Sequence, residues 1–134
     1  MDSLKRCGLP AKERIKSRKD FEELYTAGRL VFSSDKKIKA IYLISEAENP
    51  GVKIAPAVSS KAGNAVWRNR VKRLIKEAYR LNKEVVTGPV LQKKVLLRIV
   101  FSPGYLNKKN NIWPKLNEIV PGVVEIMQKI KSVL

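Results

Sequence analysis

The sequence predicts an α+β fold: a four-stranded sheet with helices packed on one face. Two observations lead to this class. Four short segments have the alternating or continuous apolar pattern of strands, and three longer ones have apolar residues at helical spacing. The predicted order is α-β-β-β-α-β-α, which gives a two-layer sandwich. The 134 residues, 44% of them hydrophobic, fit a single domain over residues 1–134 with a core of its own.

The chain begins with a segment, residues 1–13, that is expected to be irregular. A helix is predicted over 17–27, with Ser17 as its N-cap and Gly28 at its end. Three of its residues are spaced to share one face: Phe21, Leu24 and Tyr25.

Three strands are predicted to follow, over 29–34, 37–45 and 52–60. Pro56 lies inside the third, and since proline cannot donate a ladder hydrogen bond, this strand is expected at an edge or with a bulge. In the second strand, alternation places Ile38, Ala40, Tyr42 and Ile44 on one face, and Ile41 and Leu43 on the other.

The second half of the chain holds the strongest helix pattern, over 64–81, with Asn64 as its N-cap. Residues 82–93 are expected to be a connection with one further helical turn, and 94–102 a buried strand. A C-terminal helical segment is predicted over 112–134, kinked or split by Pro121. The apolar stripe of the first of these helices contains Trp67, Val71, Leu74, Ile75, Ala78 and Leu81.

Composition restricts the possible functions. The chain has 28 Lys and Arg against 12 Asp and Glu, a net charge of +16, which attracts polyanions. It has no His, which excludes His-based acid–base catalysis and most zinc sites. Its single Cys, Cys7, excludes a disulfide framework and fits a reducing compartment. No apolar run is long enough to span a membrane, and no secretory signal is visible, so the cytoplasm is expected.

Two polyanions remain as partners: nucleic acid and an anionic membrane surface. Membrane binding would need an exposed apolar stripe on an amphipathic helix, and the core is expected to use that stripe. Nucleic acid is therefore favoured.

The positive charge is concentrated in residues 59–80, which carry seven cations and one acid, Glu77. Four cations at a spacing of four residues form a row in which charges repeat about every 6 Å. A merely solvated helix face usually interleaves acids with its cations. This one does not, and the pattern favours RNA binding. The row is Arg68, Lys72, Lys76 and Arg80.

The run "GNAVWRNRVKRLIKEAYR" resembles the RNR signature of the bacterial ribonuclease P protein subunit. The resemblance covers about residues 10–101. An N-terminal pattern of the same family is matched by Arg14, Asp20, Phe21, Tyr25, Gly28 and Arg29.

The resemblance implies a fold like that of domain 2 of ribosomal protein S5, with a left-handed βαβ crossover whose helix bears the RNR motif. It implies a ribonucleoprotein endonuclease, a hydrolase that removes the 5′ leader from precursor tRNA. The RNA subunit would catalyse cleavage with Mg²⁺, and the polypeptide would supply no catalytic residue. The alternative is a ribosomal or general RNA-binding protein without a role in cleavage.

The expected partners are ribonuclease P RNA and precursor tRNA with its leader, and neither DNA nor a membrane. Binding to the catalytic RNA is predicted for Lys61, Gly63, Asn64, Arg68, Asn69, Arg70, Lys72, Arg73, Lys76 and Arg80. A leader-binding cleft is predicted from Arg14, Phe21, Tyr25 and Tyr42. The aromatic residues would stack on bases without regard to sequence.

Overall fold

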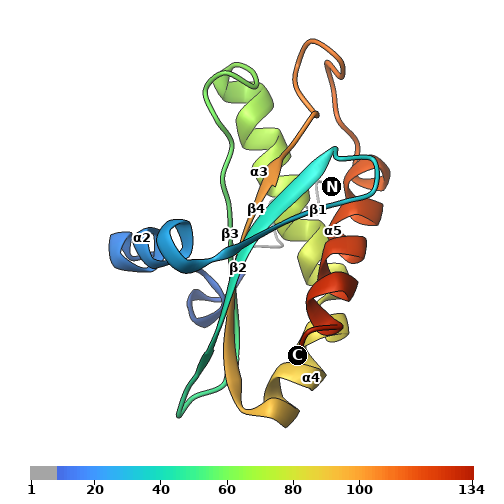
Figure 1. Ribbon diagram of the computed structural model, residues 1–134. Coiled ribbons are helices and arrows are strands. Elements are labelled where there is room, and N and C mark those ends of the chain that lie inside the picture. Colours follow the sequence, from blue (N-terminus) through green and yellow to red (C-terminus); the bar gives the residue numbers. More distant parts are fainter. Residues whose placement is uncertain (1–8) are drawn as a thin grey trace.

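The computed structural model describes residues 9–134 (Figure 1). Cys7 and most of the segment expected to be irregular lie outside these residues. Ala11–Glu13, within that segment, form a short 3₁₀ turn, η1. One helix and three strands follow: α2 (Arg18–Ala27), β1 (Arg29–Phe32), β2 (Ile38–Glu46) and β3 (Gly51–Pro56). The second half of the chain contains α3 (Ala65–Asn82), α4 (Glu84–Lys93), β4 (Val95–Pro103) and α5 (Leu116–Lys131).

The four strands form one sheet in the order β1-β2-β4-β3. The β1–β2 and β2–β4 pairs are antiparallel, whereas β3 and β4 are parallel and are joined by α3 and α4. Pro56 is the last residue of β3, an edge strand of the sheet, so the edge position predicted from this proline is confirmed. The strand ends four residues earlier than predicted.

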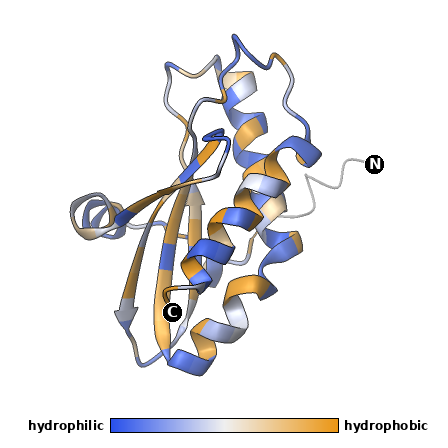
Figure 2. Cartoon of the chain, turned by 45° about the vertical axis from the view of Figure 1, so that its right-hand side comes forward, coloured by the Kyte–Doolittle hydropathy of each residue, from blue (hydrophilic) through white to orange (hydrophobic). Residues whose placement is uncertain are grey.

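Helices α3, α4 and α5 cover one face of the sheet, whereas α2 lies against the opposite face (Figure 1). The register of β2 separates the two layers: Ala40 and Tyr42 join the large core under α3 and α5, and Ile41 and Leu43 pack toward α2. Figure 2 shows apolar residues along the strands and along the helices that cover them. The sheet thus has one face fully covered and one face covered only in part.

Helix α3 has the predicted boundaries to within one residue, and the Asn64 side chain accepts a hydrogen bond from the Trp67 N–H at 2.9 Å. Its apolar stripe is buried as expected, with one exception. Leu81 is exposed, and Tyr79 is buried in the core. Buried residues of α3 recur every four positions, whereas the helix has 3.6 residues per turn. The buried stripe therefore drifts around the helix axis along its length.

Residues 82–93 differ from the prediction. Instead of a connection with one turn, most of them form helix α4, which spans Glu84–Lys93. Lys83 keeps a right-handed helical conformation between α3 and α4, and Val86 and Val90, four residues apart, are both buried. Burial of this face outweighs the poor helix propensity of Gly88 and Pro89.

Pro121 does not split the C-terminal helix, since α5 runs as one helix from Leu116 to Lys131. The next residue, Gly122, is buried where α5 crosses β2. A Cβ atom at this position would lie 2.8 Å from Cγ1 of Ile38. Gly122 therefore permits the close approach of α5 to the sheet, and the Pro-Gly pair serves packing instead of ending the helix.

Two glycine substitutions test this packing. Gly122→Ala is expected to lower the free energy of unfolding by about 1–2 kcal/mol, because the added methyl group overpacks the α5–β2 contact. Gly88→Ala is the matched control: it also lies inside a helix, but a Cβ there meets nothing within 4 Å. This control should gain about 0.5–1 kcal/mol from helix propensity. Urea denaturation checks both, and equal stabilisation of the two variants would contradict the packing role.

Candidate nucleic-acid interface

The first candidate surface lies on the side of α3 that faces away from the sheet. Arg73 is exposed, and Arg68, Lys72 and Lys76 are partly exposed. Within residues 9–134, no carboxylate forms an ion pair with any of these four cations. Asn69 is exposed among them. A group of cations without acidic partners creates the positive potential that attracts phosphates. We call Arg68, Lys72, Arg73 and Lys76 the α3 basic surface.

Arg80, the last cation of the predicted row, has a different environment. Its Nη2 lies 2.6 Å from Oε1 of Glu77, whose side chain is buried. The nearby carboxylate offsets the positive charge of Arg80. The positive potential along α3 is therefore strongest between Arg68 and Lys76. Near Arg80 it is weaker than the spacing of the cations alone predicts.

The packing at the start of α3 accounts for a glycine at position 63 and an asparagine at position 64. A Cβ atom on Gly63 would lie 2.8 Å from Cε3 of the buried Trp67 ring. Trp67 Nε1 in turn donates a hydrogen bond to the Asn111 carbonyl at 2.8 Å. Gly63 and Asn64 thus fix the entry of the chain into α3. Their contact with an RNA phosphate remains a prediction.

The second candidate surface is an open groove of about 720 Å³ on the face of the sheet that α2 covers only in part. Its lining includes Tyr25 and Leu30 together with Lys39 and Ile41 of β2. Lys61, which the sequence analysis grouped with the RNR motif, also lines the groove. Ala62 also lines the groove, three residues before α3 begins. Arg68 of the α3 basic surface donates from Nε to the carbonyl of the next residue, Gly63, at 3.1 Å, so the segment 59–64 links the two candidate surfaces.

The residues predicted for the leader cleft occupy different places. Tyr25 lines the groove and is 56% exposed. Phe21 is half-buried and packs against the small cluster of Ile15, Leu24, Ala55 and Val100 between α2 and the sheet. Arg14 is exposed, and its backbone forms a parallel bridge with Ile54 at the open edge of β3.

The placement of Tyr42 in this cleft is wrong. Tyr42 pairs with Arg29 and Ile99, and its side chain is buried in the core under the helices on the opposite face. Lys39, Ala40 and Ile41 of β2 line the groove, whereas Tyr42 does not. Strand alternation already separated Tyr42 from Ile41, so it could have located Lys39 in the groove.

A buried cation holds α2 against the sheet beside the groove. Arg98 of β4 is 7% exposed, and its Nη1 lies 2.7 Å from Asp20 Oδ1 and 3.1 Å from Glu23 Oε2, both on α2. Burial alone would raise the pKa of Asp20. Hydrogen bonds from Ser17 and Arg98 outweigh burial, and they hold this pKa below its usual value.

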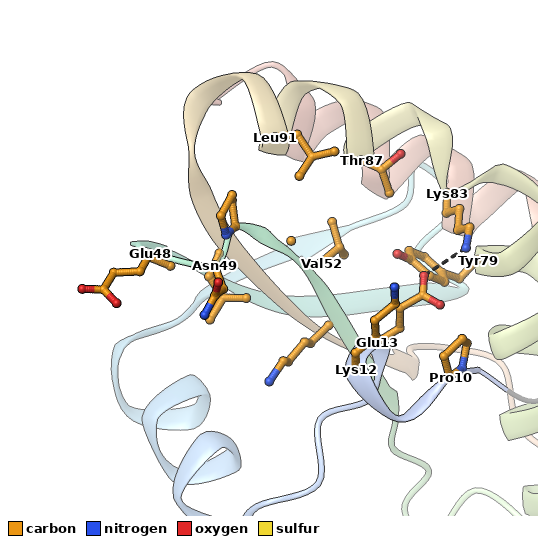
Figure 3. A pocket seen from close by; sticks show the side chains of 15 residues that line it. Pro10, Lys12, Glu13, Glu48, Asn49, Val52, Tyr79, Lys83, Thr87 and Leu91 are labelled. Carbon is orange, nitrogen blue, oxygen red and sulfur yellow. Dashed lines mark hydrogen bonds and ion pairs between the residues drawn. The ribbon is translucent and has the colours of Figure 1, made fainter.

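Another cavity, of about 920 Å³, lies at the opposite end of the sheet, between η1, the β2–β3 loop and α4 (Figure 3). Lys83 and Glu13 form an ion pair of 3.0 Å at its wall. The nearby Tyr79 hydroxyl is buried without a hydrogen-bond partner in the described part of the chain, and burial raises its pKa. None of the residues predicted to bind RNA lines this cavity.

Two absences in residues 9–134 bear on the alternatives. The acidic side chains do not group in threes, as the ligands of a protein-bound metal ion would. The helices of this part of the chain also lack the length and apolar character that crossing a bilayer requires.

The α3 basic surface, whose four cations have no ion pair within residues 9–134, and a nearby groove lined by an aromatic ring and by cations define an RNA-binding α+β protein. Comparisons with known proteins identify the family. The family model described as Ribonuclease P matches residues 9–115. The ribonuclease P protein component of Dictyoglomus turgidum is 33% identical over 112 residues, 84% of this chain and 86% of the relative. That of Geotalea uraniireducens is 39% identical over 80 residues, 60% of this chain and 67% of the relative.

The fold is also that of a solved family member. The RNase P protein from Thermotoga maritima superposes with a TM-score of 0.69 over 87% of this chain and 96% of that one, at 20% identity. This chain belongs to the ribonuclease P protein family, whose members are subunits of an endoribonuclease that acts with an RNA subunit in tRNA 5′ processing. Membership in this family rejects the alternative of a ribosomal or general RNA-binding protein.

Proposed function

We propose that this chain binds ribonuclease P RNA through the α3 basic surface and the single-stranded 5′ leader of precursor tRNA in the groove between α2 and the sheet. The observation that carries the proposal is the short link between the two surfaces: Lys61 and Ala62 line the groove, and Arg68 of the α3 basic surface donates a hydrogen bond to the Gly63 carbonyl. One protein can then contact both RNAs at once and hold the substrate beside the catalytic RNA. The cytoplasm is the expected location for this work.

The groove has the chemistry that an arbitrary leader sequence requires. Tyr25 offers a ring on which any base can stack, and Lys39 and Lys61 offer charges for the phosphates. Stacking and phosphate contacts are largely independent of sequence, which suits a protein that meets many different leaders.

We assign no step of cleavage to a side chain of this protein. The chain has no His, and the carboxylates of residues 9–134 form no cluster of three or more. The Mg²⁺ implied by the family resemblance is proposed to act with the RNA subunit. The protein contributes affinity and position.

Tyr25→Ala tests the groove in the reconstituted protein–RNA enzyme. Affinity for precursor tRNA should fall about 5- to 20-fold, because one base loses its stacking partner. Affinity for mature tRNA, which has no leader, should not change. The measurement is equilibrium binding of both RNAs under conditions that prevent cleavage.

Tyr105→Ala is the control, because Tyr105 is an exposed tyrosine, at 66% against 56% for Tyr25, that is not among the residues that line the groove. This variant should bind both RNAs as the native protein does. An equal loss for precursor and mature tRNA with Tyr25→Ala, or no loss at all, would contradict leader binding in the groove.

A further inference from the structure

An exposed tryptophan lies beside the α3 basic surface. The guanidinium carbon of Arg70 is 4.1 Å from the centroid of the Trp113 ring, and Arg70 Nε donates a hydrogen bond to the Pro114 carbonyl at 2.7 Å. Despite this contact, Trp113 is 54% exposed. Arg70 therefore supports the ring from one side, and much of the indole surface stays open to solvent.

The segment that presents this ring is anchored at several points to the helices around it. The Asn111 carbonyl accepts from Trp67 Nε1, and the Asn111 side chain donates to Glu118 Oε2 at 2.9 Å. Lys108 N donates to the Ala62 carbonyl at 2.8 Å, and Lys115 N donates to Glu118 Oε1 at 3.0 Å. These contacts come from both α3 and α5, so the ring is held in place before any partner arrives. Preorganisation lowers the entropic cost of binding.

The surroundings of the ring indicate the chemistry of its partner. Ile112 and Val66, which is one helical turn before Arg70, are both exposed, so apolar surface extends to either side of the contact. Arg73 and Lys115 are exposed cations of the same region, and Arg73 belongs to the α3 basic surface. An exposed aromatic ring among cations is the arrangement that binds unpaired bases: the ring stacks on the base and the cations meet the phosphates.

We propose that Trp113, supported by Arg70, is a stacking platform for an unpaired base of ribonuclease P RNA. The proposal rests on the proposed function, since it takes the RNA partner from there. It commits to the catalytic RNA and not to the leader, because the supporting residue lies on α3 beside the α3 basic surface, and neither Arg70 nor Trp113 lines the leader groove. The match to the RNR motif assigns Arg70 to RNA. The structure gives it the additional role of fixing the platform.

Fluorescence tests the platform directly, because the chain contains only two tryptophans and Trp67 is buried. Addition of ribonuclease P RNA to the full chain should quench the emission of Trp113 as a base stacks on it. Trp113→Phe, in which Trp67 is the remaining reporter, should show little change. A single-stranded leader oligonucleotide should not quench native protein. Quenching by the leader alone, or equal quenching in Trp113→Phe, would overturn the assignment.

Affinity for the same RNA separates stacking from simple apolar contact. Trp113→Ala and Trp113→Leu should each weaken binding about 10-fold, whereas Trp113→Phe, which keeps an aromatic face, should stay within about threefold of native protein. Ile112→Ala is the matched control for loss of neighbouring apolar surface, and it should bind normally. Urea denaturation of each variant checks that the fold is intact.

The possible outcomes distinguish the two proposals. If native protein fails to bind ribonuclease P RNA, the proposed function itself fails. If native protein binds and Trp113→Ala binds equally well, only the platform is wrong, and this exposed surface would serve another partner, such as a protein. If Trp113→Leu binds like Trp113→Phe, the contact is apolar and no base stacks there.

Discussion

Replacement of Lys72, Arg73 and Lys76 by Gln is expected to lower the affinity for ribonuclease P RNA on the order of 100-fold at moderate salt. The three cations have no ion-pair partner in residues 9–134, so their loss should leave the fold and its stability unchanged. The dependence of log affinity on log salt should also become shallower, by about 2–3, because up to three fewer counterions are released. Binding titrations at several salt concentrations measure both effects.

A second triple variant controls for net charge. Lys93, Lys94 and Lys131 are exposed at the end of the molecule where α4 and the C-terminus lie, away from the start of α3 (Figure 1). Their replacement by Gln removes the same three charges and should cost little affinity. Equal losses in the two triple variants would mean that RNA responds to total charge alone. The α3 basic surface would then have no special role.

Removal of both carboxylates that face Arg98 should produce a large loss of stability. The double variant Asp20→Ala/Glu23→Ala leaves the buried guanidinium without either ion-pair partner, and Arg98 Nε of the native protein has no hydrogen-bond partner among residues 9–134. We expect the free energy of unfolding to fall by ~3 kcal/mol, at the lower end of the range for a buried pair, because the carboxylates are partly exposed. Urea denaturation measures this value.

Addition of Arg98→Met to the double variant should recover most of the lost stability, because it replaces an unpaired buried charge by an apolar side chain of similar length. If the triple variant is as unstable as the double variant, the loss arises from α2 itself and not from the buried charge.

The same contact predicts a dependence on pH. The folded-state pKa of Asp20 is lowered, so its contribution is complete above the usual carboxyl pKa, near 4, and is lost as the pH falls through the lowered value. The pKa values of Asp35 and Glu125 are also lowered, chiefly by hydrogen bonds from Lys37 N–H and from Ser34, so they add to the acid sensitivity. Asp20→Asn should therefore lose less stability than native protein between about pH 4 and pH 2.

Local signals in the sequence were sufficient for much of the fold. Ser17 and Asn64 cap the two helices they were predicted to cap, because a cap depends on residues within one turn. Pro56 located an edge strand for a similar reason, since proline cannot donate to a neighbouring strand. In contrast, α4 and the unbroken α5 depend on burial against distant parts of the chain, which local propensity does not contain.

The sequence predicted those parts of the candidate site whose residues lie close together in the chain. The α3 basic surface follows from spacing within one helix. The groove does not, because it joins Tyr25, Lys39 and Lys61 from separate elements, and the choice of Tyr42 assumed the wrong face of β2. The contact between Arg70 and Trp113 spans 43 residues and carries no local signal. The two residues meet because the segment before α5 returns to the start of α3.

The central claim is that this protein assists cleavage by ribonuclease P RNA, and leader removal at low Mg²⁺ tests it most directly. The purified chain is added to its cognate ribonuclease P RNA, and the rate of leader removal from precursor tRNA is compared with that of the RNA alone. We predict a higher rate with native protein, and a rate near that of RNA alone with the Lys72, Arg73 and Lys76 triple variant at the same protein concentration. A rate that native protein does not raise would contradict the account.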